Sequence, residues 1–488
     1  MRSVYFKQRM FLKDIAYSGI SKYSTIIIVL IVTSILARLL SPSDFGVVAI
    51  ATVFITFFNL VSDFGIATAI VQFKNLTQDD IKNIFGWTFW IAILLSSLFF
   101  LCSPLLSTFY DNPLLNSVCQ LLSFQVLFAT LNIVPNALLV KQKKFNVIAA
   151  RTLSIQILCG VASVAAAFNA VGIYSLLINP IIGTFLNFVI NVVYMKLSIK
   201  LIPAVSSIEK IFSFSSYQFL FNFINYIGNN LDKMIIGKTI SVAGLGYYEK
   251  AYRLGQLPAH TILGVLGPVL HPYLSDYQNN PDKILDIYNK MNRILLTISF
   301  PISAYCLLCA KELILIVFGY QWIESILYFS LLSITITTNL ASSPTGSVLQ
   351  ASNQTKLLFF MGTINVFVAL IGLSIGAFVF RTILAICVMC VCTSTICFII
   401  SFCLSYKYCF KVSPLPIFLF SIKPLACFLI IGGLGYLMDS YWENSQILIT
   451  LLFKTIIWLT VLLLFLHYFS PYKPIHIVKY IMIFLKSE

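Results

Sequence analysis

Long apolar runs separated by short polar segments follow one another along the whole chain. They are too long for β-strands, which usually have about 3–10 residues, whereas a helix that crosses a bilayer needs about 20 apolar residues. The pattern therefore predicts an all-α, polytopic integral membrane protein with about 14 transmembrane helices. The expected spans are 15–40, 45–71, 83–107, 114–138, 147–168, 172–195, 211–236, 245–270, 290–310, 325–349, 357–380, 382–405, 416–438 and 446–469.

The amino-acid composition supports this interpretation. Of the 488 residues, 59% are hydrophobic and 10% are charged, whereas soluble domains carry about 25% charged residues. Fourteen spans leave room only for short loops and two tails. The composition therefore excludes an ordinary water-soluble enzyme, and no separate soluble domain fits into the chain.

The distribution of the basic residues predicts the orientation in the membrane. The chain has 32 Lys and Arg against 17 Asp and Glu. If both termini are cytoplasmic, the tails, the even-numbered loops and the span ends beside them hold 21 of the basic residues. The opposite loops and the span ends beside them hold only Arg38, Lys238, Lys311 and Arg381. Since positive residues hold loops on the cytoplasmic side, we expect both termini in the cytoplasm. The net charge of +15 then reflects topology, and we expect no nucleic-acid partner.

The chain also carries a weak internal repeat. Phe45-Gly46 opens the second span and Leu245-Gly246 opens the eighth, so the two glycines are 200 residues apart. We therefore expect a six-helix N-terminal lobe at 1–200, a six-helix C-terminal lobe at 201–410, and an additional helix pair with a cytoplasmic tail at 411–488. Transporters are often built from such repeats, with the substrate site between them.

Several of the apolar helices have a polar face. In the seventh span Asn222, Asn225, Asn229 and Lys233 follow spacings of three and four residues, and Asp232 lies beside the last of them. This spacing places the side chains on one side of a helix. The same spacing joins Asn59 and Asp63 in the second span, and Glu249, Arg253 and Gln256 in the eighth, where Lys250 is adjacent; the first span adds Lys22.

A charge at the middle of a bilayer costs about 2.5–3.5 kcal/mol on insertion scales. These polar faces are therefore expected to face water or one another, and several of them together predict a shared hydrophilic cavity. Two other interpretations remain open at this point. The Ser, Thr and Asn side chains also suit hydrogen bonds between helices, worth about 0.6 kcal/mol each, and Lys22, Arg151 and Lys233 also suit snorkelling from helix ends.

Cations outnumber carboxylates in this expected cavity, which favours an anionic substrate such as a phosphate group. Three sets of candidate residues follow from the pattern. We expect the substrate to bind at Lys22, Lys233, Lys250, Arg253 and Arg151. We expect the polar lining to include Asn59, Asn222, Asn225, Asn229 and Gln256. The candidates for binding a coupling proton or sodium ion are Asp63, Asp232 and Glu249.

The sequence offers little for catalysis or metal binding. Its four His have no metal-ligand spacing, most of its 12 Cys lie in apolar runs, and it has no P-loop. We therefore expect a protein that is not an enzyme and has no cofactor. A membrane glycosyltransferase or polymerase would need an exposed catalytic loop, and the longest loop, at 271–289, is expected on the cytoplasmic side.

Two segments carry a resemblance to a known family. They are ILARLLSPSDFGVVAIATVFITFFNLVSDFGIATAIVQ (Ile35–Gln72) and NNLDKMIIGKTISVAGLGYYEKAYRLGQLP (Asn229–Pro258). Both resemble the bacterial polysaccharide transporters, the Wzx-type flippases for O-antigen, capsule and exopolysaccharide units. That family is part of the multidrug/oligosaccharidyl-lipid/polysaccharide (MOP) exporter superfamily.

The resemblance implies two six-helix lobes around a central cavity in the bacterial inner membrane. It also implies that an oligosaccharide linked to undecaprenyl pyrophosphate moves by alternating access from the cytoplasmic to the periplasmic leaflet. The implied partners are this lipid-linked substrate, membrane lipids and other polysaccharide assembly proteins. In this superfamily, helices one, two, seven and eight typically line the cavity, and all four carry a polar face in this chain.

Other functions of the same fold remain open from the sequence. Multidrug exporters often have a carboxylate deep in the first helix, whereas the Asp14 carboxylate of this chain is at the edge of its first span. A cation-coupled exporter of drugs or metabolites is less favoured on this ground and remains the alternative function. A membrane glycosyltransferase or polymerase is the alternative that the sequence favours least. A flippase for the peptidoglycan precursor would differ from the first hypothesis only in the glycan.

Overall fold

The structure is a computed structural model and describes residues 2–73, 75–278, 280–441 and 446–468. Over these ranges the chain is built from helices and contains no strand, which confirms the expected all-α class. The end of the expected last span, at residue 469, and the C-terminal tail lie outside the described residues. By contacts between residues the chain divides into two compact units, Met1–Gly246 and Tyr247–Glu488, and each is described by itself.

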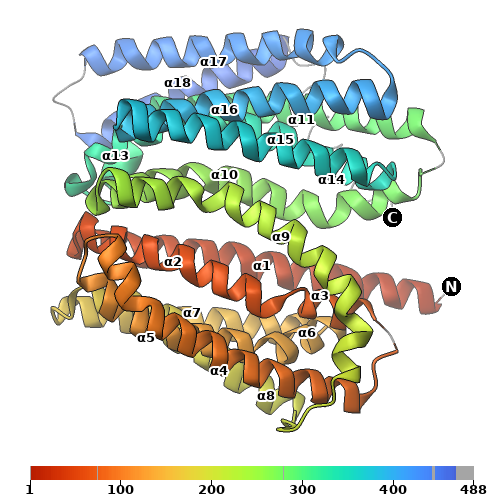
Figure 1. Cartoon of the computed structure of the whole chain (residues 1–488). Coiled ribbons are helices and arrows are strands. Elements are labelled where there is room, and N and C mark those ends of the chain that lie inside the picture. The colour runs from red at the N-terminus through yellow and green to blue at the C-terminus, as the bar shows by residue number, and fades with distance from the viewer. Residues whose placement is uncertain (1, 74, 279, 442–445, 469–488) are drawn as a thin grey trace. The chain divides into compact units, whose positions relative to one another are not determined.

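The first unit contains helices that run roughly parallel or antiparallel to one another (Figure 1). Its elements are α1 (Arg2–Leu39), α2 (Pro42–Asp63), α3 (Ile66–Gln72), α4 (Gln78–Phe109), α5 (Leu114–Leu131), α6 (Ile133–Lys141), α7 (Phe145–Phe168), η1 (Gly172–Leu177), η2 (Asn179–Gly183), α8 (Thr184–Met195) and α9 (Ser206–Thr239). Helix α9 packs against α2, α3 and α4 of this unit.

The second unit begins within α10, whose first residues belong to the first unit. Its elements are α10 (Val242–Ser275), α11 (Pro281–Leu308), α12 (Ala310–Val317), η3 (Tyr320–Trp322), α13 (Glu324–Ser333), α14 (Thr335–Ala351), α15 (Thr355–Ser374), η4 (Ile375–Phe380), α16 (Ile383–Leu404), η5 (Ser405–Phe410), α17 (Leu415–Tyr441) and α18 (Ile447–Tyr468). The domain boundaries expected at residues 200 and 410 remain predictions.

The number of spans agrees with the expectation. Among the described residues, 12 helical segments are long and apolar enough to cross a membrane. Helices α9 and α10 have 34 residues each and carry the polar faces of the expected seventh and eighth spans. With these two helices the set corresponds to the 14 spans expected from the sequence, and the chain is a multi-pass membrane protein.

The second expected span differs from a single helix because the chain breaks after Asp63. Phe64 and Gly65 adopt left-handed backbone conformations, with φ of 39° and 77°. Gly65 has no Cβ and tolerates this conformation without strain. The carboxylate of Asp63 accepts a hydrogen bond from the backbone N–H of Ala67 at 3.0 Å and so stabilises the start of α3.

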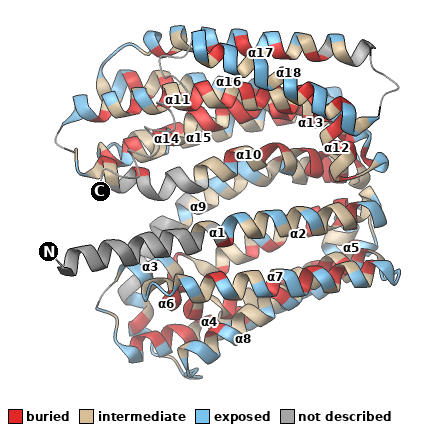
Figure 2. Cartoon of the chain, turned by 180° about the vertical axis from the view of Figure 1, so that it is seen from behind, coloured by how far each residue is buried: buried red, intermediate tan, exposed pale blue. Residues whose placement is uncertain are grey.

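Apolar contacts between helices form the core of each unit. In the first unit, one cluster joins α3, α4 and α6 through the side chains of Ile70, Ile84, Phe85 and Val134. In the second unit, one cluster joins α10, α11 and α16, and another joins α11 to α17 and α18. Large apolar side chains stay exposed on the outside of several helices, for example along α17 (Figure 2), as lipid-facing surfaces require.

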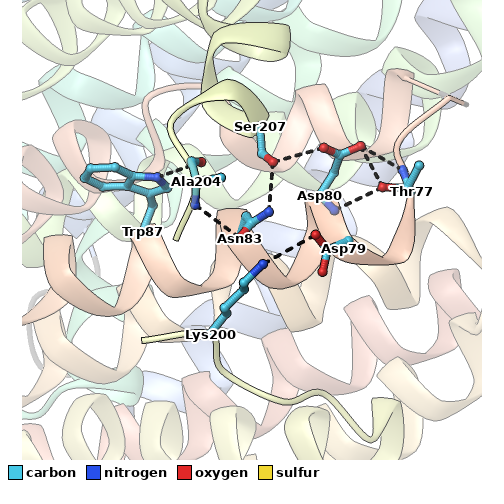
Figure 3. A network of polar contacts seen from close by, with 8 residues as sticks. All are labelled: Thr77, Asp79, Asp80, Asn83, Trp87, Lys200, Ala204 and Ser207. Carbon is cyan, nitrogen blue, oxygen red and sulfur yellow. Dashed lines mark hydrogen bonds and ion pairs between the residues drawn. The ribbon is translucent and has the colours of Figure 1, made fainter. Parts of the chain in front are cut away.

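A buried network of polar side chains binds the start of α9 to the start of α4 (Figure 3). Ser207 Oγ donates a hydrogen bond to Asp80 Oδ1 at 3.0 Å, and Asn83 Nδ2 donates to Ser207 Oγ at 3.1 Å. The other oxygen of Asp80 accepts from the backbone N–H of Thr77 at 3.1 Å and so caps α4. One carboxylate therefore stabilises its own helix and holds another helix in place.

The segment before α9 is bound to the same face of α4. The backbone N–H of Ala204 donates to Asn83 Oδ1 at 3.2 Å, and its carbonyl accepts from Trp87 Nε1 at 3.3 Å. Trp90 Nε1 donates to the carbonyl of Leu201 at 2.9 Å. We call these contacts, together with those of Asp80 and Ser207, the linker clamp.

Gly86 allows this close approach, because a Cβ at residue 86 would lie 2.0 Å from the carbonyl oxygen of Lys200. We expect Gly86→Ala to lower the free energy of unfolding by about 1–3 kcal/mol, the usual cost of overpacking. Gly362 of α15 has no such neighbour within 4 Å, so Gly362→Ala should be neutral or stabilising by up to about 1 kcal/mol. Thermal unfolding of both variants in one detergent compares them, and equal midpoints would contradict the close contact.

Candidate functional site

Helix α10 carries four of the predicted site residues within two turns. Arg253 Nε lies 3.2 Å from Glu249 Oε1, an ion pair between positions i and i+4. The Arg253 side chain is 59% exposed and the Glu249 side chain only 10%. The guanidinium group therefore keeps donors available for an anionic group, and the carboxylate balances part of its charge.

Lys250 points into the second unit, in contrast to the exposed Arg253. It is buried, and its Nζ lies 5.7 Å from the centre of the Phe318 ring. A cation at this distance from an aromatic face is attracted to it. The structure thus places Lys250 against an aromatic side chain at the end of α12.

Gln256 lies one turn beyond Arg253 on α10 and connects this helix to α14. Its Oε1 accepts a hydrogen bond from Asn339 Nδ2 at 3.2 Å. Gln256 belongs to the polar face expected in the eighth span, and Asn339 lies on α14. Gln256 therefore takes part in a hydrogen bond between helices, the role that the sequence left open for the Ser, Thr and Asn side chains.

Helix α9 presents the longest polar row. Asn225 and Asn229 are exposed, Asn222 and Lys233 are half-buried, and Asp232 is buried. The intervening Tyr226 packs against α2, because its hydroxyl donates to the carbonyl of Val53 at 3.2 Å. The structure therefore keeps the two exposed asparagines on one helix, one turn apart, as their spacing predicts.

Helix α2 contributes Asn59 and Asp63, both half-buried. Asp63 accepts a hydrogen bond from the start of α3, as described above. The Oδ1 atom of Asn59 is buried and has no hydrogen-bond partner among the described residues. On the same face of α2, the hydroxyl of Thr52 donates a hydrogen bond to the carbonyl oxygen of Val48, and that of Thr56 donates to the carbonyl oxygen of Thr52.

Arg151 and Lys22 lie on other helices. Arg151 of α7 donates to the side-chain oxygens of Asn191 and, at 3.5 Å, Asn136. Asn191 in turn donates to Asn132 Oδ1 at 2.7 Å, so these residues form one network within the first unit. Lys22 of α1 is exposed. In the hydrogen bonds described above, neither Arg151 nor Lys22 contacts another predicted site residue.

One buried charged pair was not predicted from the sequence. Lys454 Nζ of α18 lies 2.8 Å from Glu312 Oε1 of α12 and 3.0 Å from the carbonyl oxygen of Leu308. Both side chains are almost completely buried. A lysine within the apolar run 446–469 was the available signal, because ionisable residues inside spans are costly and rarely lack a role.

The described residues hold no group of three or more His, Cys, Asp or Glu side chains suited to a metal ion. The predicted site residues of α2, α9 and α10 are cations, carboxylates and amides. Such groups suit the binding of a substrate that carries phosphate and hydroxyl groups.

Comparison with known proteins gives both a sequence family and relatives. A family model described as "Polysaccharide biosynthesis protein" matches residues 35–327. The lipopolysaccharide biosynthesis protein WzxC of Escherichia coli (strain K12) is 23% identical over 373 residues, which cover 75% of each chain. The teichuronic acid biosynthesis protein TuaB of Bacillus subtilis (strain 168) is 25% identical over 313 residues, covering 62% of this chain and 63% of TuaB.

Solved structures with the same fold are transporters. The lipid II flippase MurJ in an inward closed conformation matches with a TM-score of 0.72 at 14% identity, over 92% of this chain and 98% of MurJ. An inward-facing multidrug resistance MATE transporter of the MOP superfamily matches with a TM-score of 0.59 at 13% identity, over 77% of this chain and 93% of the transporter. At these identities the matches show the fold, and they confirm the MOP-type fold expected from the sequence.

Proposed function

The chain belongs to the polysaccharide biosynthesis protein family, and we propose that it is a flippase for a lipid-linked oligosaccharide. The proposal is carried by agreement between the sequence family and the fold. The family model covers residues 35–327, and the fold of a lipid II flippase covers 92% of the chain. The proposed substrate is an O-antigen, capsule or exopolysaccharide unit on undecaprenyl pyrophosphate, moved from the cytoplasmic to the periplasmic leaflet of the inner membrane.

The proposed binding of the pyrophosphate rests on the cations of α9 and α10. Arg253 is exposed and offers two-point contact to phosphate oxygens, while Lys233 adds a point charge. The exposed amides of Asn225 and Asn229 suit sugar hydroxyls, since an amide both donates and accepts hydrogen bonds. Lys250, Lys22 and Arg151 remain proposed contributors of positive charge, and Asn59, Asn222 and Gln256 remain proposed lining residues.

Movement by alternating access requires a step that returns the empty carrier. We assign this step to binding of a proton or sodium ion at a carboxylate. Asp232 and Glu249 are buried, and Asp63 is half-buried. Binding or release of a cation would therefore strongly change the electrostatic energy of each carboxylate. No catalytic step is assigned to the chain.

We expect Arg253→Ala to lower surface polysaccharide at least about tenfold in cells that lack their own flippase. Losing one charged hydrogen bond costs about 1.5–3 kcal/mol, and 1.4 kcal/mol corresponds to a factor of ten. Lys233→Ala should act in the same direction, and Arg253→Lys should retain part of the activity. Lys356→Ala, at an exposed position at the start of α15, is the matched control.

Each variant is first checked for stable insertion by its amount in the membrane fraction. Surface polysaccharide at the unsubstituted level in both Arg253→Ala and Lys233→Ala would contradict the cationic substrate site. A loss with Lys356→Ala as large as with Arg253→Ala would also contradict it, because charge alone would then explain the effect.

The alternative function, a cation-coupled exporter of drugs or metabolites, is favoured by the match to a MATE transporter. The two proposals differ in the phenotype of a deletion. Accumulation of a lipid-linked oligosaccharide in the deletion strain supports the flippase. Increased sensitivity to toxic organic cations with normal polysaccharide supports the exporter.

A further inference from the structure

The ten residues between α8 and α9, Lys196 to Val205, expose an unusual number of aliphatic side chains for a polar loop region. Ile202 is 89% exposed and Leu201 is 59% exposed. Ile199 and Val205 are exposed as well. Scattered apolar residues on a surface are ordinary, whereas four within one short segment indicate an interaction surface.

The linker clamp explains why these side chains point outward. Backbone groups of the segment bond to α4, since Leu201 O accepts from Trp90 and both backbone groups of Ala204 bond to α4 side chains. With its backbone fixed on α4, the segment leaves the side chains of Leu201 and Ile202 exposed. Figure 3 shows how Lys200, Ala204 and Ser207 contact α4, so the segment is held in place on this helix.

The segment lies at the ends of two membrane-spanning segments. It follows directly on the membrane-spanning segment Gly172–Met195 and is bound to the first turns of another, Gln78–Phe109. Trp90 is exposed beside it and uses its indole N–H to hold it. Tryptophan is enriched at this depth, where one part of the ring contacts acyl chains and the N–H stays in a polar layer.

The charge of the segment selects the kind of lipid. It contains Lys196 and Lys200, both exposed, and no acidic residue. Asp79 of α4 lies 3.4 Å from Lys200, and the side chains of Asp79 and Lys200 are 71% and 45% exposed. Each lysine close to an anionic membrane surface contributes about 1 kcal/mol of attraction, so Lys196 and Lys200 beside exposed aliphatic side chains suit anionic headgroups above an acyl layer.

We propose that residues 196–205 bind the surface of an anionic bilayer, with Leu201 and Ile202 among the acyl chains and Lys196 and Lys200 at lipid phosphates. The linker clamp holds the segment in the orientation that this contact needs. The proposal concerns the membrane around the protein and holds for any transported substrate.

The test uses the full chain in lipid nanodiscs that contain 30% phosphatidylglycerol. A fluorescent amino acid is placed by stop-codon suppression at Ile202, at Leu101 on the exposed side of α4, or at Gln142, an exposed polar position between α6 and α7. Brominated lipids and aqueous acrylamide then quench the fluorescence from the two sides. We expect brominated lipids to quench the probe at residue 202 about as strongly as the probe at 101. This quenching should be at least twofold stronger than that of the probe at 142.

The charge contribution is tested by lipid composition. Replacing phosphatidylglycerol by neutral lipid should weaken the lipid quenching at residue 202 at least about twofold, and the variant Lys196→Gln/Lys200→Gln should show no such dependence. Unchanged thermal unfolding of this variant shows that the fold is intact. Equal quenching in both lipid mixtures would overturn the assignment of the lysines to anionic headgroups.

Two other results would overturn the whole proposal. One is a probe at residue 202 that acrylamide quenches as strongly as the probe at 142. The other is a probe that is open to acrylamide in nanodiscs and protected only in native membranes, which would assign the segment to a protein partner.

Discussion

Replacing Lys454 by methionine is expected to lower the free energy of unfolding by about 3–5 kcal/mol, the cost of leaving one charge of a buried pair without its partner. The Lys454 side chain is 0% exposed and that of Glu312 is 3% exposed. Methionine has a similar length, so the change removes the charge and leaves most of the packing. Unfolding of the purified protein in detergent, followed by circular dichroism, measures the effect.

The double variant Lys454→Met/Glu312→Gln separates the charge from the packing. It removes both ions, so no unpaired charge remains buried, and part of the stability lost in the single variant should return. The control is Lys290→Met, whose lysine forms an exposed pair with Asp286 at 2.7 Å, worth no more than about 1 kcal/mol. Additive losses in the double variant would contradict a direct interaction of Lys454 with Glu312.

Asp80→Ala is expected to destabilise the first unit by about 2–4 kcal/mol, because two separate contributions are lost. Removing a capping side chain costs about 0.5–2 kcal/mol, and leaving a buried polar group without its partner costs about 1–3 kcal/mol. Asp80 caps α4 through Thr77 and accepts the hydrogen bond of Ser207. Thermal unfolding of the variant, together with its membrane level in cells, measures the loss.

The adjacent Asp79 provides a matched control of the same residue type. Its carboxylate is exposed and pairs with Lys200 at 3.4 Å, so Asp79→Ala should change stability by no more than about 1 kcal/mol. Ser207→Ala should fall between the two aspartate variants, since it removes the hydroxyl contact and leaves the cap of α4 intact. Similar losses in Asp79→Ala and Asp80→Ala would contradict the assigned role of the clamp.

Most of the architecture follows from the spacing of residues along single helices. The apolar runs predicted the spans, and the interval of four residues between Glu249 and Arg253 predicted that they share a helix face, where they form an ion pair. The break at Phe64 and Gly65 was missed because the apolar run continues through it. Its cause is backbone conformation, which a hydropathy pattern does not record.

The sequence did not indicate which distant residues would become partners. Gln256 bonds to Asn339 and Lys454 bonds to Glu312, and these pairs depend on which helices of a unit become neighbours. Periodicity identifies the polar face of a helix and leaves its partner undetermined. For the candidate site, the sequence therefore selected the polar rows of α2, α9 and α10, and the structure added the individual partners of Asp63, Lys250, Gln256 and Arg151.

The attachment of residues 200–207 to α4 limits how transporters of this kind can be recombined. A chimera that changes parentage between the sixth and seventh spans would separate Ser207 and Ala204 from Asp80 and Asn83, which lie more than 100 residues earlier in the chain. Such an exchange needs the matching stretch of α4 from the same parent, or a junction placed beyond Ser207.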